Sequence, residues 1–516
     1  MTGAIGCILV LTACTGLPIR PDVAPSAAIP ASSDTHLGRV AAASTPKPPD
    51  SAFRLLHSGT LALDARIALV RAAERSLDVQ YYQVGDDNTG RAFLGELKAA
   101  SARGVRVRLL LDDLHTGGQQ ASLTGLASFA HVDVRVFNPL PVRDGSWAQR
   151  MVPSLAHIGQ LQMRMHNKLL IADGAFAITG GRNVADEYYW QSETSAFFDL
   201  DAVLVGPAVK ELAALFDLFW NSPRVWPIEA LGKPEGDSAQ RRDRFDAFIA
   251  GARPPAAPRI PVDVLGYGRL ADDIERGQVR LHVGRVQAVA DQPQKVAEGP
   301  FVAADLWDAP SDIRRAFNSV TRAAQAETVL ISPYAVPGEV GVARTVANRA
   351  RGVRIRILTN SLASTDEPTV HTGYSRYRKR MLQAGAKLYE IDPLPSERLV
   401  LAEMRGSPVL RIHTKAAVVD RRVVYLGSMN LDPRSVALNT EIGVIIESEA
   451  LAADVLQLVD ALMARQAWQV WLDADGELKW SSGEPDTPPL HVEPRTTLWQ
   501  RLRLHLQSVF VPESVL

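Results

Sequence analysis

The segment from His166 to Asn183 reads HNKLLIADGAFAITGGRN, and a second segment from His413 to Asn430 reads HTKAAVVDRRVVYLGSMN. Each places a histidine two residues before a lysine, an aspartate five residues after that lysine, and a glycine three residues before an asparagine. In an extended strand residues i and i+2 share a face, so each histidine projects together with its lysine. The recurrence of the whole pattern predicts two related units in one chain.

Other sequence segments near these two recur as well. ASARGVRVRLLL (100–111) returns as NRARGVRIRILT (348–359), at nearly the same displacement as the two histidine segments. Helical spacing in GRAFLGELKAASARG is followed by strand-like alternation in VRVRLLLDD. Because helices and strands alternate along the chain, we expect an α/β fold in two halves, each a mixed β-sheet flanked by helices.

Composition suggests where these halves begin and end. A chain of 516 residues with 46% hydrophobic and 22% charged residues can bury more than one core. Residues 14–50 are rich in Pro, Ala and Ser, which predicts a tether. We expect the first half over 51–300 with a polar insertion near 227–275, the second half over 301–484, and a tail over 485–516 that contains an amphipathic helix.

The first residues, MTGAIGCILVLTAC, contain both cysteines of the chain, Cys7 and Cys14. Their apolar run is about ten residues long, too short for a membrane span and suited to a secretory signal. LTAC resembles a bacterial lipobox, which predicts removal of residues 1–13 and lipidation of Cys14. The alternative is an N-terminus that is merely apolar. With Thr15 after the cysteine, lipidation would imply a membrane-anchored protein that faces the periplasm, at the outer membrane in bacteria with two membranes.

The paired histidine and lysine indicate an anion site. A protonated lysine has no lone pair and repels a metal ion, so the pattern predicts a site with neither metal nor cofactor. Gly180 and Gly427 allow close approach of the backbone to a ligand. Asn183 and Asn430 can donate an amide N–H to a phosphoryl oxygen. Together these residue types predict a phosphate site.

Both segments fit the HKD signature of the phospholipase D superfamily, and the chain resembles the bacterial cardiolipin synthases of the C type. The similar words include SLDVQYYQVGDDNTGR, FFDLDAVLVG and GSMNLDPRSVALNTEIGVII, and they extend over nearly everything from Ser51 onward. The resemblance implies two phospholipase D-like domains that face each other across a pseudo-twofold axis and share one cleft. Its signature positions are His166, Lys168, Asp173, Gly180 and Asn183, and His413, Lys415, Asp420, Gly427 and Asn430.

The resemblance also implies a mechanism. One histidine attacks phosphorus to form a phosphohistidine, while the other protonates the departing alcohol and later activates the incoming one. We favour His166 as the nucleophile and His413 as the acid; the reverse assignment is the alternative. Lys168 and Lys415, with the two asparagines, would hold the nonbridging oxygens as charge builds on them.

Each imidazole needs an acceptor for its Nδ1 proton. FFDLD supplies Asp199 near the first signature and NTEIG supplies Glu441 near the second, and we predict that each carboxylate orients the histidine of its own half. The alternative is that they cap turns or pair with surface arginines.

Several other polar residues have weaker claims. Asp173 and Asp420 fall at strand ends, so we expect them to organise the site rather than to carry protons. Ser428 is a one-sided candidate for phosphate contact, because Gly181 stands at its place in the first half. Asp112 and Asp113 end a strand, and solvated turn residues are the simpler interpretation.

These expectations favour phosphatidyl transfer, in which a phospholipid donates its phosphatidyl group to the enzyme and phosphatidylglycerol accepts it to give cardiolipin. Phosphatidylglycerol is the expected substrate, and phosphatidylethanolamine is a second candidate donor. Hydrolysis by the same route, with water as the acceptor, is the alternative, and a phosphodiesterase or nuclease is a weaker one. The net charge of -1 and the lack of interleaved basic and aromatic runs argue against nucleic acid as a partner.

A noncatalytic, membrane-tethered lipid-binding protein is a further class, which the two intact signatures disfavour. The tail sequence TTLWQRLRLHLQSVF places Trp499, Leu502, Leu506 and Val509 on one helical stripe. This stripe could lie on a membrane surface or pack on the body of the protein.

Overall fold

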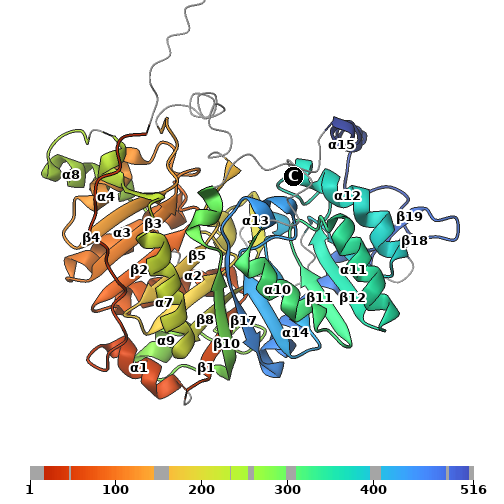
Figure 1. The fold of residues 1–516 in the computed structure, drawn as a ribbon, viewed down its shortest axis with the longest axis horizontal. Helices are drawn as coiled ribbons and strands as arrows, with labels where there is room; N and C mark the ends of the chain where they lie inside the picture. The colour runs from red at the N-terminus through yellow and green to blue at the C-terminus, as the bar shows by residue number, and fades with distance from the viewer. Residues whose placement is uncertain are drawn as a thin grey trace, which may run out of the picture.

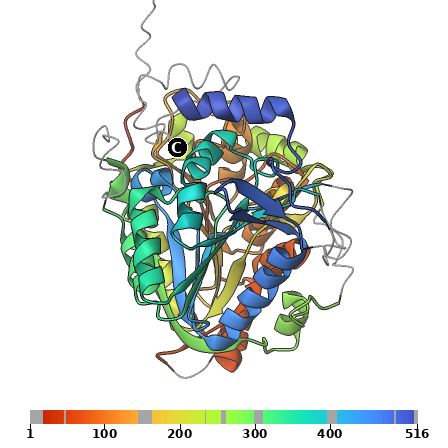
Figure 2. The ribbon, with the colours of Figure 1, turned by 90° about the vertical axis from the view of Figure 1, so that its right-hand side faces the viewer.

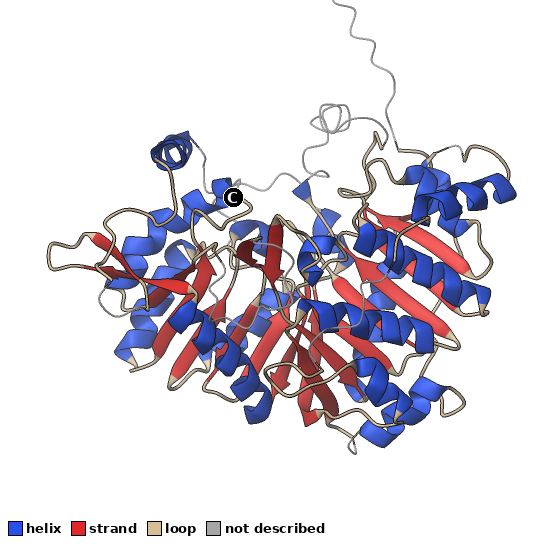
Figure 3. Cartoon of the chain, turned by 180° about the vertical axis from the view of Figure 1, so that it is seen from behind, coloured by secondary structure: helices blue, strands red, loops and turns tan. Residues whose placement is uncertain are grey.

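A computed structural model describes residues 17–45, 48–143, 162–232, 234–253, 261–297, 310–394, 408–483 and 487–510. Among these residues, seventeen strands form one continuous sheet that runs through both halves of the chain, and helices cover both of its faces (Figures 1 and 3). Two further short strands, β7 and β14, pair only with each other. This α/β architecture confirms the fold class predicted from the sequence.

The first half contributes strands in the order β9-β4-β3-β2-β5-β6-β8-β1, in which only β2, β3 and β4 are parallel neighbours. The strands are β1 (Ser51–Leu56), β2 (Ser76–Tyr81), β3 (Arg106–Asp112), β4 (Val132–Phe137), β5 (Lys168–Ala172), β6 (Phe176–Gly180), β7 (Ser195–Phe198), β8 (Asp201–Val205) and β9 (Val225–Pro227). The helices are α1 (His36–Ser44), α2 (Gly59–Ala72), α3 (Asn88–Ala102), α4 (Gln120–Ala127), η2 (Asp186–Tyr189), α7 (Pro207–Trp220), η3 (Ile228–Leu231), α8 (Ser238–Ile249) and α9 (Leu270–Glu275).

The second half continues the sheet as β10-β17-β16-β15-β11-β12-β13-β18-β19, in which only β11, β12 and β13 are parallel neighbours. The strands are β10 (His282–Ala290), β11 (Glu327–Ile331), β12 (Arg354–Asn360), β13 (Lys387–Ile391), β14 (Val409–Ile412), β15 (Ala416–Val419), β16 (Val423–Gly427), β17 (Ile442–Glu447), β18 (Ala467–Leu472) and β19 (Leu478–Ser481). The helices are η4 (Pro293–Ala297), α10 (Asp312–Arg322), α11 (Gly338–Ala350), α12 (Pro368–Gln383), α13 (Pro433–Ala437), α14 (Glu449–Arg465) and α15 (Leu498–Phe510).

Strand β10 joins the halves. It pairs antiparallel with β1, where Phe53 lies opposite His282, and with β17, where Val286 lies opposite Ile446. Within the second half it occupies the place that β1 occupies in the first, beside the strand that follows the signature hairpin. We therefore place the internal division before β10, ahead of the boundary near residue 300 that composition suggested.

The core is also shared between the halves. One buried cluster combines apolar side chains of α7, such as Leu212 and Phe216, with those of α14, such as Val455 and Val459, over strands of both halves. A second cluster lies under α2, α3 and α4 of the first half, and smaller clusters lie on the corresponding face of the second. Burial of this continuous apolar surface holds the two repeats in a fixed relation.

The segment before Ser51 differs from the expected tether. Residues 36–44 form helix α1, capped by the hydroxyl of Thr35, and Leu37 and Val40 are buried in the core of the first half. The backbone N–H of Ala28 donates to Asp217 over 2.8 Å. Composition suggested a free linker, but three apolar residues at helical spacing and a cap are enough to dock this stretch.

The insertion and the tail lie at the surface. Helix α8 of the insertion packs on α4. Helix α15 contacts α12 and lies across one end of the molecule (Figure 2). Its Leu504 is buried, while Trp499, Leu502 and Leu506 are 77%, 43% and 52% exposed. None of the helices in the described ranges has the length and apolarity needed to cross a bilayer.

Candidate active site

Strand pairing between the halves brings the two signatures together. β14 pairs in parallel with β7, with Ile412 opposite Phe198, so the next residues, His413 and Asp199, become neighbours. The N–H of His413 donates to the carbonyl of Phe198 over 2.9 Å. Because β7 belongs to the first half and β14 to the second, backbone hydrogen bonds to the other half set the position of each histidine.

The reciprocal contact follows the same rule. Met165 forms a parallel bridge with Thr440, and the N–H of His166 donates to the carbonyl of Thr440 over 2.9 Å. The residue after Thr440 is Glu441, which therefore lies beside His166. The two halves thus exchange carboxylates.

The imidazole contacts correct the prediction that each carboxylate serves its own half. Nδ1 of His166 lies 2.9 Å from Oε2 of Glu441 and 3.1 Å from the carbonyl oxygen of Ser428. Nδ1 of His413 lies 2.6 Å from Oδ2 of Asp199. The physical reason is the parallel pairing across the halves, which has no local signature in the sequence.

This geometry fixes the tautomer of both histidines. Since each Nδ1 faces oxygen acceptors, it must carry the proton, which leaves the lone pair on Nε2. Both rings line one cavity of about 720 Å³. A tyrosine ring lies at the edge of each imidazole, Tyr82 at 5.0 Å from His166 and Tyr188 at 5.0 Å from His413. Two nucleophilic nitrogens are therefore available to one ligand.

The lysines lie behind the histidines. The ammonium of Lys168 donates to the carbonyl of His166 over 2.6 Å, and that of Lys415 donates to the carbonyl of His413 over 2.5 Å. Both side chains are fully buried. Neither lysine is among the described residues that line the cavity. Each ammonium has three N–H groups, so one bond to the backbone leaves two, and their contact with a phosphoryl oxygen stays a prediction.

Asn183 and Asn430 line the cavity, and their contact with a phosphate stays a prediction. Among the described residues no partner is found for Oδ1 of either amide, while Nδ2 of Asn183 donates to the hydroxyl of Tyr188 over 2.8 Å. Gly180 and Gly427 act differently from the expectation of close approach to a ligand. A Cβ at Gly180 would lie 2.4 Å from Asp201, and one at Gly427 would lie 2.6 Å from the carbonyl of Ile442, so these glycines allow close packing of strands.

Ser428 is also placed differently from its predicted phosphate contact. Its hydroxyl donates to Oε2 of Glu441 and accepts from the N–H of Ile442. The side chain is fully buried and is absent from the described lining of the cavity. Ser428 therefore positions Glu441, and through it His166.

Asp173 and Asp420 lie away from the cavity. Asp173 accepts from the backbone N–H groups of Glu74, Arg75 and Ser76, and Asp420 accepts from those of Gln325, Ala326 and Glu327. Each holds the first residues of a neighbouring strand. We therefore assign them structural roles in place of a catalytic one.

Asp112 and Asp113 are fully buried, which corrects their interpretation as solvated turn residues. Asp112 accepts from the N–H of Met165 over 2.8 Å and pairs with Arg164, and Asp113 pairs with Arg143. Burial raises the pKa of Asp112 to about 6. Because Met165 directly precedes His166, Asp112 helps to position the first signature.

Burial dominates the electrostatics of the site. It lowers the pKa of both His166 and His413 well below the usual value, and the neighbouring lysines lower it further. Burial likewise lowers the pKa of Lys415 to about 8 and raises the pKa of Glu441 to about 7. These surroundings therefore favour neutral imidazoles, and an anionic ligand would favour protonating one of them.

Sequence reasoning missed part of the cavity wall. Glu187, Asp366 and Glu367 bring acidic groups to it, and Arg411 and Arg434 bring basic ones. Arg434 follows the second signature closely in NLDPRS, a signal that could have found it. Glu187 lies in the short helix η2, Asp366 and Glu367 directly precede α12, and none of the three had a distinguishing pattern. Cys14, the predicted lipidation site, lies outside the described residues.

These features define a symmetric two-histidine phosphoryl-transfer site, and comparison with known proteins agrees. A family model described as "Cardiolipin synthase, PLD-like domain" matches residues 67–220 and 319–463, once in each half. The chain belongs to this family of phospholipase D-like cardiolipin synthases, which confirms the resemblance seen in the sequence.

The individual matches extend over most of the chain. It is 36% identical over 471 residues to cardiolipin synthase C of Escherichia coli K12, covering 88% of this chain and 94% of that protein. It is 24% identical over 412 residues to cardiolipin synthase 2 of Staphylococcus epidermidis, covering 79% and 67%. The crystal structure of phosphatidylserine synthase from Haemophilus influenzae Rd KW20 is similar in fold, with a TM-score of 0.54 at 13% identity over 81% of this chain and 87% of that one.

Proposed function

We propose that this enzyme transfers a phosphatidyl group through a phosphohistidine to the primary alcohol of phosphatidylglycerol, which yields cardiolipin. The observation that carries this proposal is the crossed pair of imidazoles on one cavity, each with Nδ1 bound to a carboxylate of the opposite half. Membership in the cardiolipin synthase family supports the same reaction.

In the first step Nε2 of His166 attacks phosphorus, and the bond from phosphorus to the leaving alcohol oxygen breaks. Protonated His413 gives its Nε2 proton to that oxygen, and Asp199 stabilises the imidazolium while it exists. His166 is favoured as the nucleophile because its Nδ1–H meets two acceptors, the Glu441 carboxylate and the Ser428 carbonyl.

In the second step neutral His413 takes the proton of the incoming alcohol. The alkoxide oxygen bonds to phosphorus, and the bond from phosphorus to Nε2 of His166 breaks. Lys168, Lys415 and the asparagines support the charge on the nonbridging oxygens in both steps. With water as the acceptor the product is phosphatidic acid, which is the hydrolase alternative.

The cavity wall bears on the choice of donor lipid. Glu187, Asp366 and Glu367 line it together, and burial, with neighbouring carboxylates adding to it, raises the pKa of Glu187 and Glu367. A cationic headgroup would relieve this repulsion, so phosphatidylethanolamine fits as a donor and phosphatidylglycerol as the acceptor.

The exposed stripe of α15 supports contact with a membrane surface. Trp499, Leu502 and Leu506 project from a helix that packs on α12, and the start of α12 contributes Thr369 and Val370 to the cavity. In Figure 1 α12, α13 and α15 all lie in the upper part of the molecule. Lipidation of Cys14 would add a second anchor and hold the enzyme on the periplasmic face, at the outer membrane where there is one.

The reaction is tested with purified protein and labelled phosphatidylglycerol, with and without phosphatidylethanolamine, by resolving cardiolipin from phosphatidic acid. Cardiolipin formation that rises with phosphatidylethanolamine supports the proposal. Phosphatidic acid alone would replace the transferase by a hydrolase, and cleavage of a nucleotide diester without any lipid turnover would replace it by a nuclease.

The intermediate is tested with His413→Ala and His166→Ala. Intact-protein mass spectrometry of His413→Ala with a phospholipid carrying a good leaving group should show a phosphatidyl adduct on His166. An adduct on His413 in His166→Ala, and none in the other variant, would reverse the two roles.

Metal removal is a separate test. The nucleophile, the acid and the charge-stabilising donors of the proposed mechanism are all side chains of this chain. We expect activity in excess EDTA to stay within about twofold of the untreated enzyme, with dialysis into metal-free buffer as the control. Loss of activity that added Mg²⁺ or Ca²⁺ restores would contradict this mechanism.

A further inference from the structure

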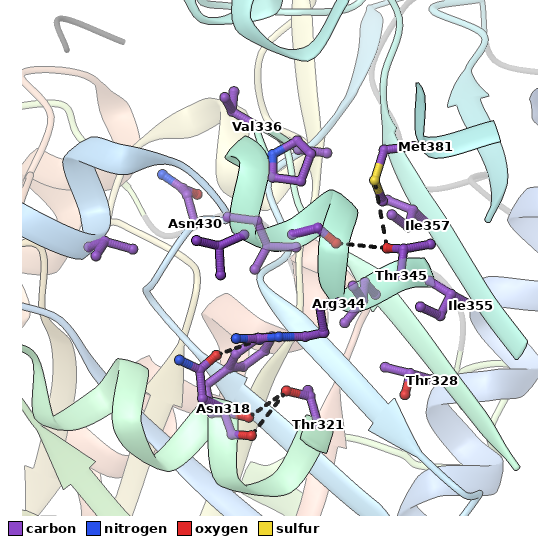
Figure 4. A pocket seen from close by; sticks show the side chains of 18 of the residues that line it. Asn318, Thr321, Thr328, Val336, Arg344, Thr345, Ile355, Ile357, Met381 and Asn430 are labelled. Atoms are coloured by element: carbon purple, nitrogen blue, oxygen red, sulfur yellow. Dashed lines mark hydrogen bonds between the residues drawn. The ribbon is translucent and has the colours of Figure 1, made fainter. Parts of the chain in front are cut away.

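A second cavity lies on the helix side of the second half, apart from the two histidines. Its volume is about 130 Å³, and it lies between α10, α11 and α12 and the strands beneath them. Its wall is mainly apolar, with Leu330, Ile355, Ile357, Met381 and Leu388 among the lining residues. The hydroxyls of Thr321 and Thr345 donate to carbonyls of their own helices, so they are already satisfied (Figure 4).

One part of this cavity is basic. Arg344 reaches from α11 toward α10, where it donates to Oδ1 of Asn318 over 2.7 Å (Figure 4). Arg314 also lines the cavity, and none of the described lining residues is acidic. Burial, with the charges of Arg322 and Arg314, lowers the pKa of Arg344. The guanidinium of Arg344 therefore lies near other guanidinium groups and beside apolar side chains.

The repeat shows that this arrangement is particular to the second half. Leu77 lies opposite Val107 in the first half and Thr328 lies opposite Ile355 in the second, which fixes the correspondence of the helices that precede these strands. On that correspondence Phe93 is replaced by Gly341 and Leu97 by Thr345. Phe93 and Leu97 are fully buried, so the first half fills with side chains the space that the second half leaves open.

The charges differ in the same way. In the first half Arg71 and Glu96 form an ion pair with 2.5 Å between Nη2 and Oε1. The corresponding residues of the second half are Arg322 and Arg344, so the acid has been replaced by a second base. A bound anion would supply next to Arg344 the negative charge that Glu96 supplies in the first half.

We propose that this cavity binds a single acyl chain with an anionic end group, whose head meets Arg344 and whose chain lies along Ile355, Ile357 and Met381. The volume of this cavity is close to that of a cavity that holds one benzene molecule, so it admits part of one acyl chain and excludes two chains side by side. A fatty acid and a lysophospholipid share this chemistry. The guanidinium fork suits a carboxylate and a phosphate equally.

The position of the cavity gives it a link to catalysis. Asn430 lines both this cavity and the catalytic one, and the neighbouring segments alternate between them. Tyr334 and Asp432 face the catalytic cavity, while Val336 and Leu431 face the apolar one. The N–H of Val336 donates to the carbonyl of Leu431 over 2.8 Å, so one shared wall separates the two ligands.

The first half supplies the test variants. Arg344→Glu restores the ion pair of the first half by pairing with Arg322, and Thr345→Leu restores the filling residue. Arg349→Glu makes the same charge change on the exposed side of the same helix and is the matched control. Circular dichroism and thermal unfolding check that all three variants fold.

Binding is measured by isothermal titration of the full chain with decanoate, a chain short enough to stay monomeric. We expect Arg344→Glu and Thr345→Leu each to weaken binding about tenfold or more, and Arg349→Glu to leave it unchanged. Methyl decanoate, which lacks the charge, should bind the unmodified protein at least tenfold more weakly. A decanoyl lysophospholipid run in parallel distinguishes the two natural sources by which binds more tightly.

Several outcomes would overturn the proposal. These are no binding of either amphiphile, equal loss in Arg344→Glu and Arg349→Glu, or binding of the methyl ester as tight as that of the acid. Because binding is measured without turnover, the site can stand if the transferase assay fails, and it can fail while cardiolipin is still formed.

Discussion

At the scale of single residues, the chemistry depends on carboxylates exchanged between the halves. Asp199 holds His413, and Glu441 with Ser428 holds His166. A carboxylate in this position fixes the tautomer and stabilises the imidazolium, and its loss in comparable sites costs orders of magnitude in rate. The exchange also determines which catalytic step each carboxylate supports.

This exchange predicts different substrate dependences for Asp199→Asn and Glu441→Gln. Asp199→Asn should lower kcat at least about 100-fold with an ordinary phospholipid, because the acid His413 loses its partner. With phosphatidyl-p-nitrophenol, whose leaving group needs little protonation, the loss should shrink to about tenfold or less. Glu441→Gln should lose about equally on both substrates, because it affects the nucleophile.

The control for this pair is Asp133→Asn, a carboxylate that pairs with Arg135 near the surface. It should retain full activity on both substrates. The opposite result would be a loss that depends on the leaving group in Glu441→Gln but not in Asp199→Asn. It would mean either that each carboxylate serves the histidine of its own half or that the roles of the two histidines are reversed. The adduct experiment decides between these two explanations.

The pH dependence follows from buried groups, with Glu441 on the acid side and Lys415 on the alkaline side, where burial lowers the pKa of Lys168 in the same direction. Burial raises the pKa of Glu441 to about 7, so the carboxylate that His166 needs is lost as pH falls below that value. Burial lowers the pKa of Lys415 to about 8, so its ammonium is lost as pH rises above that value. We expect kcat/KM to follow a narrow bell between these limits.

Lys415→Arg tests the alkaline side of this bell. A guanidinium keeps its charge throughout the measurable range, so the alkaline limb should move up by at least one pH unit, although the maximum rate falls. An alkaline limb that stays near pH 8 in this variant would show that another group controls it.

The sequence predicted the two histidines and the two asparagines that meet in the cavity, but it did not predict how the histidines pair with carboxylates. His413 and Asp199 are 214 residues apart, and their contact arises from the pairing of β7 with β14. Such pairing across the halves leaves no periodicity in either segment. For the same reason the burial of Asp112 and the role of Ser428 could not be inferred from their neighbours in sequence.

At the scale of elements, the signature aspartates act as clamps between strands. Asp173 adopts a left-handed backbone with φ of 52°, and Asp420 does so with φ of 50°. Each accepts hydrogen bonds from the N–H groups at the start of a central strand, β2 or β11. Sequence position at a strand end correctly predicted an organising role, and the structure adds which strand is held.

Asp173→Ala should therefore affect stability first. The substitution removes the hydrogen bonds that three backbone N–H groups donate to this carboxylate. It also places alanine in the left-handed backbone region, which alanine disfavours, so the free energy of unfolding should fall by about 3 kcal/mol. Asp173→Asn should lose about half as much, because its amide oxygen still accepts.

Chemical denaturation measures the stability change, and kcat at a temperature where the variant is folded should stay within about threefold of the original. A variant of normal stability with kcat reduced by orders of magnitude would return Asp173 to the catalytic group.

Elements outside the repeat were harder to predict. Helix α1 lies in a segment whose Pro, Ala and Ser content suggested a free linker, yet Leu37 and Val40 dock it on the first half. Composition averages over such short stretches and conceals three apolar residues at helical spacing. The repeated helices and strands were predictable because their periodicity extends over whole elements.

At the scale of the whole molecule, the exposed stripe of α15 predicts how the protein meets lipid. Replacing Trp499, Leu502 and Leu506 together by serine should lower partitioning onto phospholipid vesicles at least tenfold, because these side chains would otherwise bury their exposed area. Turnover of a dispersed short-chain phospholipid should be unchanged. Vesicle co-sedimentation measures the partitioning.

The control carries serine at Val262 and Val346, which are 49% and 53% exposed outside α15. It should sediment with vesicles like the original protein. Equal loss in the control and in the α15 variant would show that general surface apolarity, and not this helix, directs binding.

Strand β10 also affects the order in which the two alcohols occupy the cavity. Backbone bonds from β10 to both β1 and β17 join the two repeats in one sheet, which restrains hinge motion between them. We expect the cavity to keep nearly the same size throughout the cycle, so that the two alcohols use it in succession. The leaving alcohol has to depart before the acceptor alcohol arrives. Between these events the phosphatidyl group stays bound to the protein, and only the cavity walls keep water from it.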